Sequence, residues 1–246
     1  MIISVDIGGT KIAVALVDGN QILGRRMAVS PLHSSFAEIP NVVANLCRDW
    51  LQLCDSMAIA TVGQVEGDCV HLASVQGRPT LALADEIEVR CGVRPVVLND
   101  AWAGALGEYV HGKLEKFETV IYVTVSTGIG AGIIHNGQLL TSHNGLMAHL
   151  GHMSVGRGGA AALKCNCGRS NCVDATCLHI VQSPQRTGHR VVRNDTKPAH
   201  RSLECSHSRR ASAGAIERHP DNLEERTKSL LLRPSSHIIT RFREIP

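Results

Sequence analysis

Apolar residues in the first part of the chain fall into short runs separated by glycine-rich and polar turns. The first three runs are Ile2–Ile7, Ile12–Val17 and Gln21–Val29, divided by Gly8-Gly9 and by Asp18-Gly19-Asn20. Runs of this length with turn residues between them are typical of neighbouring strands. The pattern therefore predicts a strand meander at the start of the chain.

The next stretch changes to a helical period. Apolar residues at three- and four-residue spacing predict a helix from about Phe36 to Cys54, capped by Ser34 or Ser35. These apolar positions are Ile39, Val42, Val43, Leu46, Trp50 and Leu53.

Strands and helices then alternate. Strands are expected at Met57–Val62, Val70–Ser74, Val96–Leu98, Thr119–Val125 and Gly132–His135, and helices at Leu81–Cys91 and Ala101–Val110. Three strands followed by such alternation predict an α/β fold with a mixed sheet. A faint repeat of strand, glycine turn and strand relates Val5–Ala13 to Val123–Ile133. The repeat indicates a duplicated, two-lobed fold with a cleft between the lobes.

This periodicity fades from Thr176 onward, where Arg, Ser, His and Pro dominate and only Leu223–Leu232 resembles a short helix. We therefore expect an N-terminal α/β lobe at 1–112, the start of a second lobe at 113–175 and an atypical basic tail at 176–246. The tail is either a disordered regulatory segment or the product of out-of-frame translation.

The formal net charge of +3 conceals an uneven distribution along the 246 residues. Residues 1–175 hold 12 Lys and Arg against 15 Asp and Glu, and residues 176–246 hold 13 against 7. A basic tail can bind nucleic acid, but this one has a single aromatic residue, Phe242, and no helix-turn-helix or zinc-finger pattern. We therefore expect no nucleic-acid partner.

The compartment is indicated by what the chain lacks and by its cysteines. It has no apolar stretch of the roughly 18 residues that a membrane span requires, and its N-terminal run predicts a strand rather than a signal peptide. Nine cysteines, an odd number, fit a reducing compartment better than a secreted disulfide framework. We expect a cytoplasmic protein without a membrane partner.

The turn Asp6-Ile7-Gly8-Gly9-Thr10-Lys11 is the first candidate for binding chemistry. Glycines let backbone N–H groups approach a phosphate, Thr10 and Lys11 add donors, and Asp6 could orient hydrated Mg²⁺. The alternative is an ordinary hairpin whose glycines supply positive φ. Ser126–Gly132 is a second phosphate-cradle candidate, and two such turns, one per half, could clamp a triphosphate from both sides.

Asn99-Asp100 lies at the end of an expected strand and opens a helix. Asp100 is either the helix cap or a general base in the cleft, with Asn99 holding a sugar hydroxyl beside it.

A metal site is predicted by His152, Cys165, Cys167 and Cys172, which can supply four tetrahedral ligands to structural zinc. The alternative is a loop with free thiols. We expect His149 to lie in the cleft, because the cysteine cluster completes four ligands with His152.

Together, Asp6–Lys11, Asn99-Asp100, Ser126–Gly132 and Gly151-His152 with the cysteine cluster resemble the ROK family of sugar kinases and repressors over about residues 1–175. The resemblance implies an actin-like, ribonuclease-H-like two-lobed sugar kinase fold, here with an incomplete second lobe. It also implies a homodimer in which ATP with Mg²⁺ phosphorylates a sugar at its 6-hydroxyl.

The same resemblance assigns roles to residues of this chain. Asp100 would be the base; Asn99, Asp100, His149 and Asp174 would contact the sugar; His152, Cys165, Cys167 and Cys172 would hold zinc. The ATP site would be lined by Ser4, Val5, Asp6, Ile7, Gly8, Gly9, Thr10, Lys11, Gly128, Ile129, Gly130, Ala131, Gly132, Ile133, Ile134 and His135.

The sugar expected from the resemblance is N-acetylmannosamine. Glucose kinases of the family typically have Glu three residues before the zinc histidine, whereas His149 resembles the branch that phosphorylates N-acetylmannosamine in sialic acid breakdown. Alternatives are a kinase for glucose, fructose or N-acetylglucosamine, or a non-catalytic sugar-binding relic. The repressor branch is disfavoured, since the chain starts at its first strand without a DNA-binding module.

Three departures from the family pattern stand out. Position 174 is Asp where Glu is usual, and the loop Ser74–Leu81 lacks the expected Asn-containing sugar-contact pattern. The largest departure follows Ala175, because the late Gly-Gly motif and the closing helix of the family are not recognisable in 176–246. This favours a frameshifted or truncated product with impaired activity over a regulatory tail.

Overall fold

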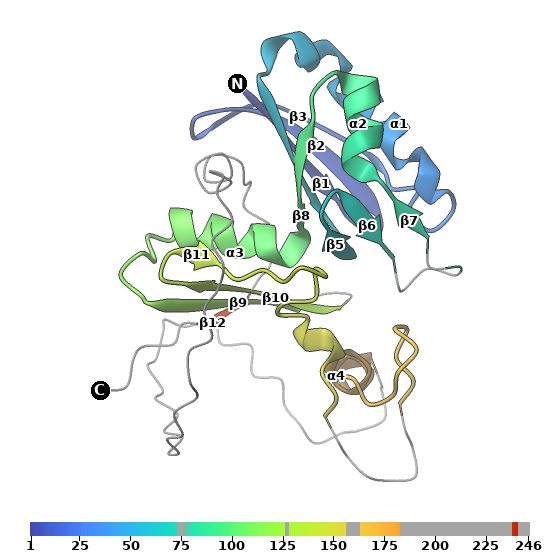
Figure 1. Ribbon diagram of the computed structural model, residues 1–246, viewed down its shortest axis with the longest axis vertical. Helices are drawn as coiled ribbons and strands as arrows, with labels where there is room; N and C mark the ends of the chain where they lie inside the picture. Colours follow the sequence, from blue (N-terminus) through green and yellow to red (C-terminus); the bar gives the residue numbers. More distant parts are fainter. Residues whose placement is uncertain (73–76, 78, 126–127, 156–162, 183–237, 241–246) are drawn as a thin grey trace.

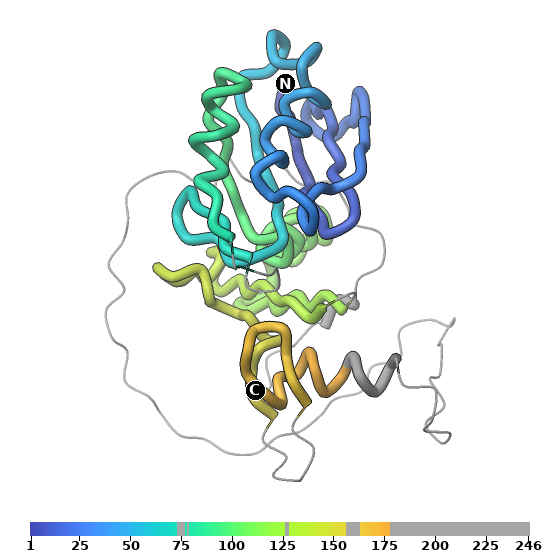
Figure 2. Tube along the Cα trace, turned by 90° about the vertical axis from the view of Figure 1, so that its right-hand side faces the viewer, coloured from blue at the N-terminus to red at the C-terminus, as the bar shows by residue number. Residues whose placement is uncertain are grey.

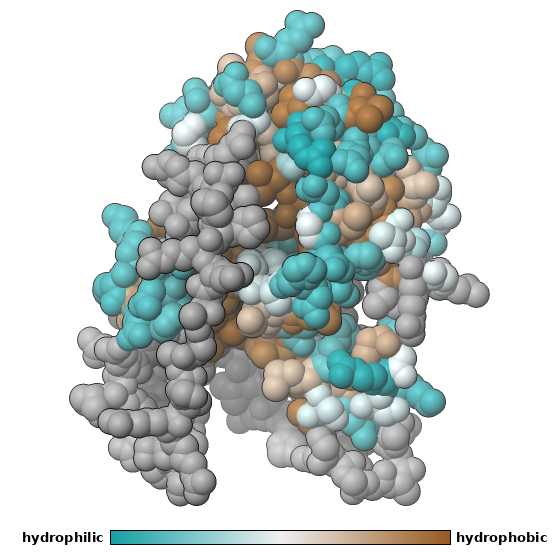
Figure 3. Space-filling view, in the orientation of Figure 1, coloured by the Kyte–Doolittle hydropathy of each residue, from teal (hydrophilic) through white to brown (hydrophobic). Residues whose placement is uncertain are grey.

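The computed structural model of the chain describes residues 1–72, 77, 79–125, 128–155, 163–182 and 238–240. These residues form two lobes, one above the other in Figure 1, with a smaller helical and hairpin unit beside the lower lobe. Figure 3 shows polar side chains over much of the visible surface of α1 and α2, and apolar side chains where the two lobes meet.

A five-stranded mixed sheet with the order β3-β2-β1-β4-β8 forms the first lobe. Its strands are β1 (Ile2–Ile7), β2 (Lys11–Asp18), β3 (Gln21–Val29), β4 (Ser56–Thr61) and β8 (Pro95–Asn99). The first three strands are antiparallel, as the predicted meander requires, and β1, β4 and β8 run parallel. The carboxyl ends of β1, β4 and β8 therefore meet at one edge of the sheet.

The sheet is buried against two helices, α1 (Ile39–Cys47) and α2 (Leu83–Cys91). The core on this face is apolar and includes Ile3, Val5, Ile7, Ile12, Val14, Val43, Met57, Ile59, Leu83 and Ile87. Alternation places Ile3, Val5 and Ile7 on this face and Ser4 and Asp6 on the other.

The helix expected over Phe36–Cys54 is broken into three pieces, which corrects the prediction. A 3₁₀ turn, η1 (Phe36–Glu38), precedes α1, and a second, η2 (Arg48–Leu53), follows it. Pro40 lies in the first turn of α1, where its missing N–H is tolerated. At the other end, Arg26 Nη1 donates to the Leu46 carbonyl at 2.9 Å, the group that a continuing α-helix would pair with Trp50 N–H.

A small antiparallel sheet lies between β4 and α2 in the chain. It consists of β5 (Gln64–Glu66), β6 (Cys69–His71) and β7 (Thr80–Leu81). One of these strands was predicted from the sequence, as Val70–Ser74; residues 73–76 and 78 lie outside the described residues.

The second lobe contains the sheet β11-β10-β9-β12. Its members are β9 (Thr119–Val125), β10 (Ile129–His135), β11 (Gln138–Leu139) and β12 (Ile238–Thr240). The antiparallel β9–β10 hairpin matches the β1–β2 hairpin of the first lobe, as the repeat predicted. The repeat ends at the next neighbour, because β1 pairs with β4 in parallel whereas β9 pairs with β12 antiparallel.

Helix α3 (Asp100–His111) starts directly after β8 but packs on β9 and β10 (Figure 1). The second core joins residues of all these elements, including Leu98, Trp102, Leu106, Tyr109, Val120, Tyr122 and Ile134. The two cores therefore meet at the start of α3, whereas the expected lobe boundary, residue 112, follows its end.

The last described helix, α4 (Val173–Gln182), follows the short turn η3 (Leu150–His152) and the cysteine-containing loop. It crosses the boundary expected at Ala175. The expected helix at Leu223–Leu232 lies outside the described residues. Within the described part of the chain, no helix is long and apolar enough to cross a membrane.

Candidate active site and metal centre

Asp100 is the first residue of α3, and the residue before it, Asn99, caps the helix. Asn99 Oδ1 accepts from the N–H groups of Ala101 at 3.0 Å and Trp102 at 3.4 Å, and Asn99 Nδ2 donates to the Gly63 carbonyl at 2.9 Å. The capping role considered for Asp100 thus belongs to Asn99. Asp100 Oδ1 accepts from the N–H of the next residue, Ala101, at 2.9 Å.

The surroundings of Asp100 favour its neutral form. Its pKa is raised from 3.8 to about 6, mainly by desolvation and also by the Asp6 carboxylate, while the Ala101 N–H at 2.9 Å from Oδ1 lowers it. The side chain is nevertheless accessible to solvent. Many protein atoms therefore lie around the carboxylate, although part of the residue remains open to solvent. Such a group suits proton transfer near neutral pH.

The β1–β2 turn lies at the same edge of the first sheet as Asp100. Gly8 N–H donates to the Lys11 carbonyl at 2.9 Å, and Asp6, Thr10 and Lys11 are exposed. Neither Gly8 nor Gly9 adopts a left-handed φ. Positive φ is therefore not the reason for these glycines, which contradicts the ordinary-hairpin interpretation of this turn.

After the corresponding β9–β10 turn, Gly130 and Gly132 have a different role from Gly8 and Gly9, because they lie against α3. A Cβ on Gly132 would lie 2.5 Å from Ala105 Cβ, and one on Gly130 would lie 3.0 Å from Ala101 Cβ. These two glycines let α3 approach the sheet, so their place in the motif has a packing explanation that the phosphate-cradle interpretation missed. Ser126 and Thr127 lie outside the described residues.

The predicted nucleotide segment Gly128–His135 runs from the turn to the far end of β10. Ala131 and Ile134 are buried in the second lobe. His135 Nδ1 lies 2.9 Å from the Thr119 hydroxyl at the end of the hairpin opposite the turn. Only Gly128 and Ile129 of this segment lie at the turn itself.

Asp174 and His149 both lie beside His152, one of the predicted metal ligands. Asp174 Oδ1 accepts from Ile129 N–H at 2.7 Å, and its Oδ2 lies 4.0 Å from His152 Nδ1. Asp174 thus fastens α4 to the start of β10 in addition to any contact with a sugar. The His149 ring stacks on His152 with 6.2 Å between centroids, and its Nε2 is buried without a hydrogen-bond partner among the described residues.

The four predicted metal ligands come together. Their donor atoms all lie within 4.8 Å of one another, in the set His152, Cys165, Cys167 and Cys172. Cys165 Sγ lies 3.6 Å from His152 Nδ1, and Cys167 Sγ lies 3.6 Å from Cys172 Sγ. Ligand atoms of a tetrahedral zinc site are about 3.5–3.8 Å apart, given Zn–S and Zn–N bonds of about 2.3 and 2.05 Å. The donor set therefore fits zinc.

Sequence reasoning missed a contact that joins the lobes and a contact that supports it. Gln64 Nε2 of the first lobe donates to the Asn144 carbonyl at 2.6 Å. Within the second lobe, Trp102 Nε1 donates to the Met147 carbonyl at 3.1 Å. No local pattern marks such contacts, because each joins segments distant in the chain.

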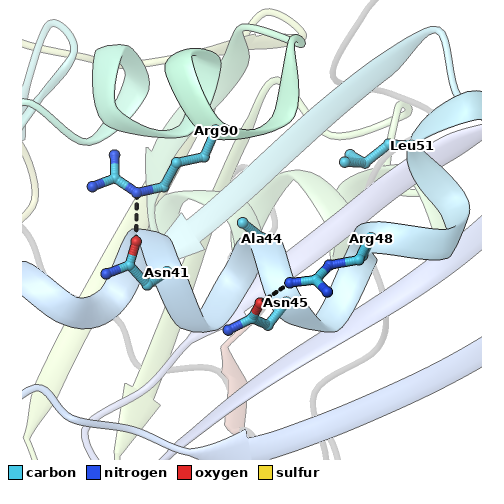
Figure 4. A pocket seen from close by; sticks show the side chains of 6 residues that line it. All are labelled: Asn41, Ala44, Asn45, Arg48, Leu51 and Arg90. Carbon is cyan, nitrogen blue, oxygen red and sulfur yellow. Dashed lines mark hydrogen bonds between the residues drawn. The ribbon is translucent and has the colours of Figure 1, made fainter.

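A separate groove of about 290 Å³ lies between α1 and α2 (Figure 4). Arg90 Nε donates to Asn41 Oδ1 and Arg48 Nη2 to Asn45 Oδ1, both at 2.6 Å. The lining residues are Asn41, Ala44, Asn45, Arg48, Leu51 and Arg90. None of them is a predicted site residue, so the groove is distinct from the candidate active site.

Comparison with known proteins places this geometry in context. The sequence model of the ROK family matches residues 2–199. The chain is 32% identical over 176 residues to N-acetylmannosamine kinase of Vibrio cholerae serotype O1, and 34% identical over 177 residues to that of Salmonella typhimurium. Each match covers 70% of this chain and 60% of the relative, so the chain spans about 60% of the length of these curated relatives.

Among solved structures, a ROK family glucokinase from Streptomyces griseus in complex with glucose and AMPPNP is 34% identical to this chain, with a TM-score of 0.60. The match covers 70% of this chain and 55% of the glucokinase. The structural match confirms the two-lobed α/β sugar kinase fold that the sequence predicted.

Proposed function

The chain belongs to the ROK family, and we propose that it is an ATP-dependent sugar kinase whose general base is Asp100. The observation that carries this proposal is the Asp100 carboxylate at the start of α3, which has a pKa of about 6. The charge of the Asp6 carboxylate contributes to this raised pKa. A base of this kind deprotonates a hydroxyl while the γ-phosphate transfers.

The phosphoryl transfer follows from this arrangement. The Asp100 carboxylate takes the proton of the sugar 6-hydroxyl as that oxygen attacks the γ-phosphorus, and ADP leaves. Asn99 holds the start of α3 by capping it, so the position of the base is set by a hydrogen-bonded helix end. Asn99 Nδ2 has a second hydrogen besides the one donated to Gly63, which can reach a sugar hydroxyl.

We place the triphosphate against the β1–β2 turn. Gly8 and Gly9 leave the backbone accessible, and Thr10 and Lys11 supply exposed donors. The exposed Asp6 carboxylate offers the oxygen ligands that Mg²⁺ prefers, directly or through its waters. When bound with ATP, Mg²⁺ neutralises charge that develops on the phosphate oxygens.

Zinc is proposed as a structural ion held by His152, Cys165, Cys167 and Cys172. It would tie η3, which follows His149, to the loop that leads into α4. The metal would thus shape the sugar-binding side of the site.

N-acetylmannosamine is the proposed substrate, and His149 supports it through the resemblance of that position to N-acetylmannosamine kinases. Overall identity does not decide the sugar, since a glucokinase and an N-acetylmannosamine kinase are both 34% identical to this chain. A kinase for glucose or another hexose is therefore the second candidate. A cytoplasmic homodimer acting in sialic acid breakdown completes the proposal.

The test is ADP release by the zinc-loaded chain with Mg-ATP and, in parallel, N-acetylmannosamine, glucose, fructose and N-acetylglucosamine. We expect turnover with N-acetylmannosamine and a loss of about 10²–10⁴-fold in kcat for Asp100→Asn. Asp85→Asn is the matched control, because Asp85 also lies in the first turn of a helix but on the surface beside Arg94.

The other outcomes are equally informative. Turnover only with glucose would select the glucokinase alternative. Sugar-dependent thermal stabilisation without ADP would indicate a sugar-binding relic. Soluble, zinc-loaded protein with neither response would overturn the proposed function.

A further inference from the structure

Two cysteines from different helices lie together in the core of the first lobe. Cys47 is the last residue of α1 and Cys91 is the last residue of α2, and both Figure 1 and Figure 2 show these helices side by side. The two sulfur atoms are 4.0 Å apart, although the residues are 44 positions apart in the chain. Outside the predicted zinc ligands, no other pair of cysteines in the described part of the chain has its sulfur atoms this close.

The packing of the two helices keeps this pair together. Cys47 is fully buried and Cys91 is 8% exposed, and both belong to the apolar core of the first lobe. The Cys47 thiol donates to the Val43 carbonyl, one turn earlier in α1, at 3.1 Å. Arg90, next to Cys91, donates to Asn41 of α1 across the groove of Figure 4. These bonds hold the ends of both helices, and hence the two sulfur atoms, in place.

The distance between the sulfur atoms is close to that of a disulfide. The S–S bond is about 2.05 Å long, so each sulfur atom would have to move by only about 1 Å, which rotation of the two side chains can supply.

The two thiols differ in reactivity. The hydrogen bond with Cys47 lowers the pKa of Cys91, and the charge of Arg90 lowers it further, while burial acts in the opposite direction. The same hydrogen bond and burial raise the pKa of Cys47. Cys91 is therefore the thiol that ionises more readily and is also the more accessible one, and Cys47 lies behind it as a neutral thiol.

We propose that Cys47 and Cys91 form an oxidation site, at which hydrogen peroxide converts the two thiols to a disulfide between α1 and α2. In a reducing compartment both residues remain thiols, as they are in the structure. The inference does not depend on the proposed function, because it concerns only the chemistry of these two side chains.

The oxidation takes place in two steps. The Cys91 thiolate attacks one oxygen of the peroxide, so that an S–O bond forms, the O–O bond breaks and hydroxide leaves as water after taking a proton. The Cys47 sulfur then attacks the Cys91 sulfur, so that the S–S bond forms and the S–O bond breaks. The thiol proton of Cys47 leaves with this oxygen as a second water molecule. In total, the two thiols lose two electrons and two protons, and one peroxide is reduced to two water molecules.

The disulfide would lie far along the sheet from the candidate active site. Cys91 ends the helix that leads into the amino end of β8, whereas Asp100 follows the carboxyl end of the same strand. We therefore expect the disulfide to act on stability rather than on the site. A crosslink between residues 44 positions apart restricts the unfolded chain and so favours the folded one.

The experiment treats the full, zinc-loaded chain with hydrogen peroxide, removes the peroxide with catalase, blocks the remaining thiols and maps the peptides by mass spectrometry. We expect a peptide pair joined through Cys47 and Cys91 that dithiothreitol separates. The oxidised chain should have a Tm at least about 5 °C above that of the reduced chain.

Variants assign the effect to this pair. Cys91→Ser should lose both the crosslink and the rise in Tm on oxidation. Cys54→Ser is the matched control and should keep both, since Cys54 is a half-buried thiol of the same lobe outside the pair. Each variant is compared with its own reduced form, so a general loss of stability from the substitution does not affect the result.

Three results would overturn the inference. The first is the absence of this crosslink when the exposed thiol of Cys177 has been oxidised, which would make Cys47 and Cys91 simply small residues of the core. The second is oxidation of Cys91 to the sulfinic acid in place of the disulfide. The third is a crosslinked chain whose Tm is equal to or below that of the reduced chain. If Cys91→Ser does not fold, the peptide map and the Tm of the unsubstituted chain decide.

Discussion

Asp100 and Ala148 are the two residues whose local physics has the clearest measurable effects. Asp100 is a carboxylate held in surroundings that favour its protonated form. Ala148, directly before His149, adopts a φ of +59°, a conformation that residues with a Cβ avoid. Strain of this kind is common where a side chain is held for function.

The rate of phosphoryl transfer should follow the ionisation of Asp100. Only the carboxylate can accept a proton, so we expect kcat to be constant above a pH of about 6 and to fall about tenfold per unit below it. A pH–rate profile measures this. A profile whose acid limb lay near 3.8, the ordinary value, would contradict the desolvated environment described for Asp100.

The raised pKa of Asp100 also makes the stability of the fold depend on pH: ionisation of Asp100 is needed for the proposed proton transfer but destabilises the folded state. Asp100 ionises near 3.8 in the unfolded chain and near 6 in the folded one, so its ionisation disfavours the folded state above about pH 6 and not below 3.8. We therefore expect Asp100→Asn to have a higher Tm than the wild type at alkaline pH. The difference should shrink as the pH falls toward 4, and thermal melts across this range measure it.

Replacing Ala148 by glycine should relieve the left-handed strain. We expect Ala148→Gly to raise the free energy of unfolding by up to about 1 kcal/mol, reduced by the greater freedom of glycine in the unfolded chain. Denaturant titration tests this. A clear loss of stability would mean that the Ala148 methyl group makes packing contacts that outweigh the strain.

At the scale of elements, the proposed zinc site of His152, Cys165, Cys167 and Cys172 can be tested directly. We expect one zinc ion per chain and loss of the metal in Cys172→Ser, because Cys172 is buried among the other donors. Cys177→Ser is the matched control, since Cys177 is an exposed thiol on α4 outside the cluster. Metal analysis distinguishes the variants, and equal zinc in both would contradict the ligand assignment.

Helix α3 packs closely on β10 because Gly130 and Gly132 have no side chains. Gly132→Ala would bring a Cβ within 2.5 Å of Ala105 and 2.8 Å of the Ala101 carbonyl, so we expect a loss of about 1–3 kcal/mol in stability. Among the described residues, a Cβ on Gly128 would come no closer than 3.6 Å to another atom, so Gly128→Ala should be nearly neutral in a thermal melt. Equal Tm values for the two variants would disprove the close packing.

Elements were predictable from the sequence where their causes are local. The strands β1, β3 and β9 have the expected bounds, because alternating residues and turn glycines define them. The end of α1 at Cys47, within the helix predicted over Phe36–Cys54, could not be foreseen from the sequence. It is accompanied by a hydrogen bond from Arg26, a residue of β3, to the Leu46 carbonyl. The packing role of Gly130 and Gly132 could not be predicted either, because the helix that packs on them, α3, comes from another part of the chain. The sequence pattern suggested only phosphate binding for these glycines.

At the scale of the whole molecule, the grouping of His152 with three cysteines and the two hairpins could be predicted from the sequence, and the contact between the lobes could not. Cysteine spacing limits which residues can share a zinc ion, and a duplicated hairpin is visible as a repeat. The contact of Gln64 with Asn144 joins residues 80 positions apart, and neither carries a sequence signal. Its importance follows only from the folded arrangement.

The position of α3 has a mechanical consequence. Helix α3 follows β8 of the first lobe directly and packs in the core of the second lobe. Its 12 residues span about 18 Å, and Asp100 lies at the end where the two lobes are connected. If the second lobe turned by about 10° about this point, the far end of the helix would sweep about 3 Å. The Asp100 carboxylate, at the pivot of this rotation, would hardly move. A turn of this kind would widen the space between the lobes while Asp100 stayed at the edge of the first sheet.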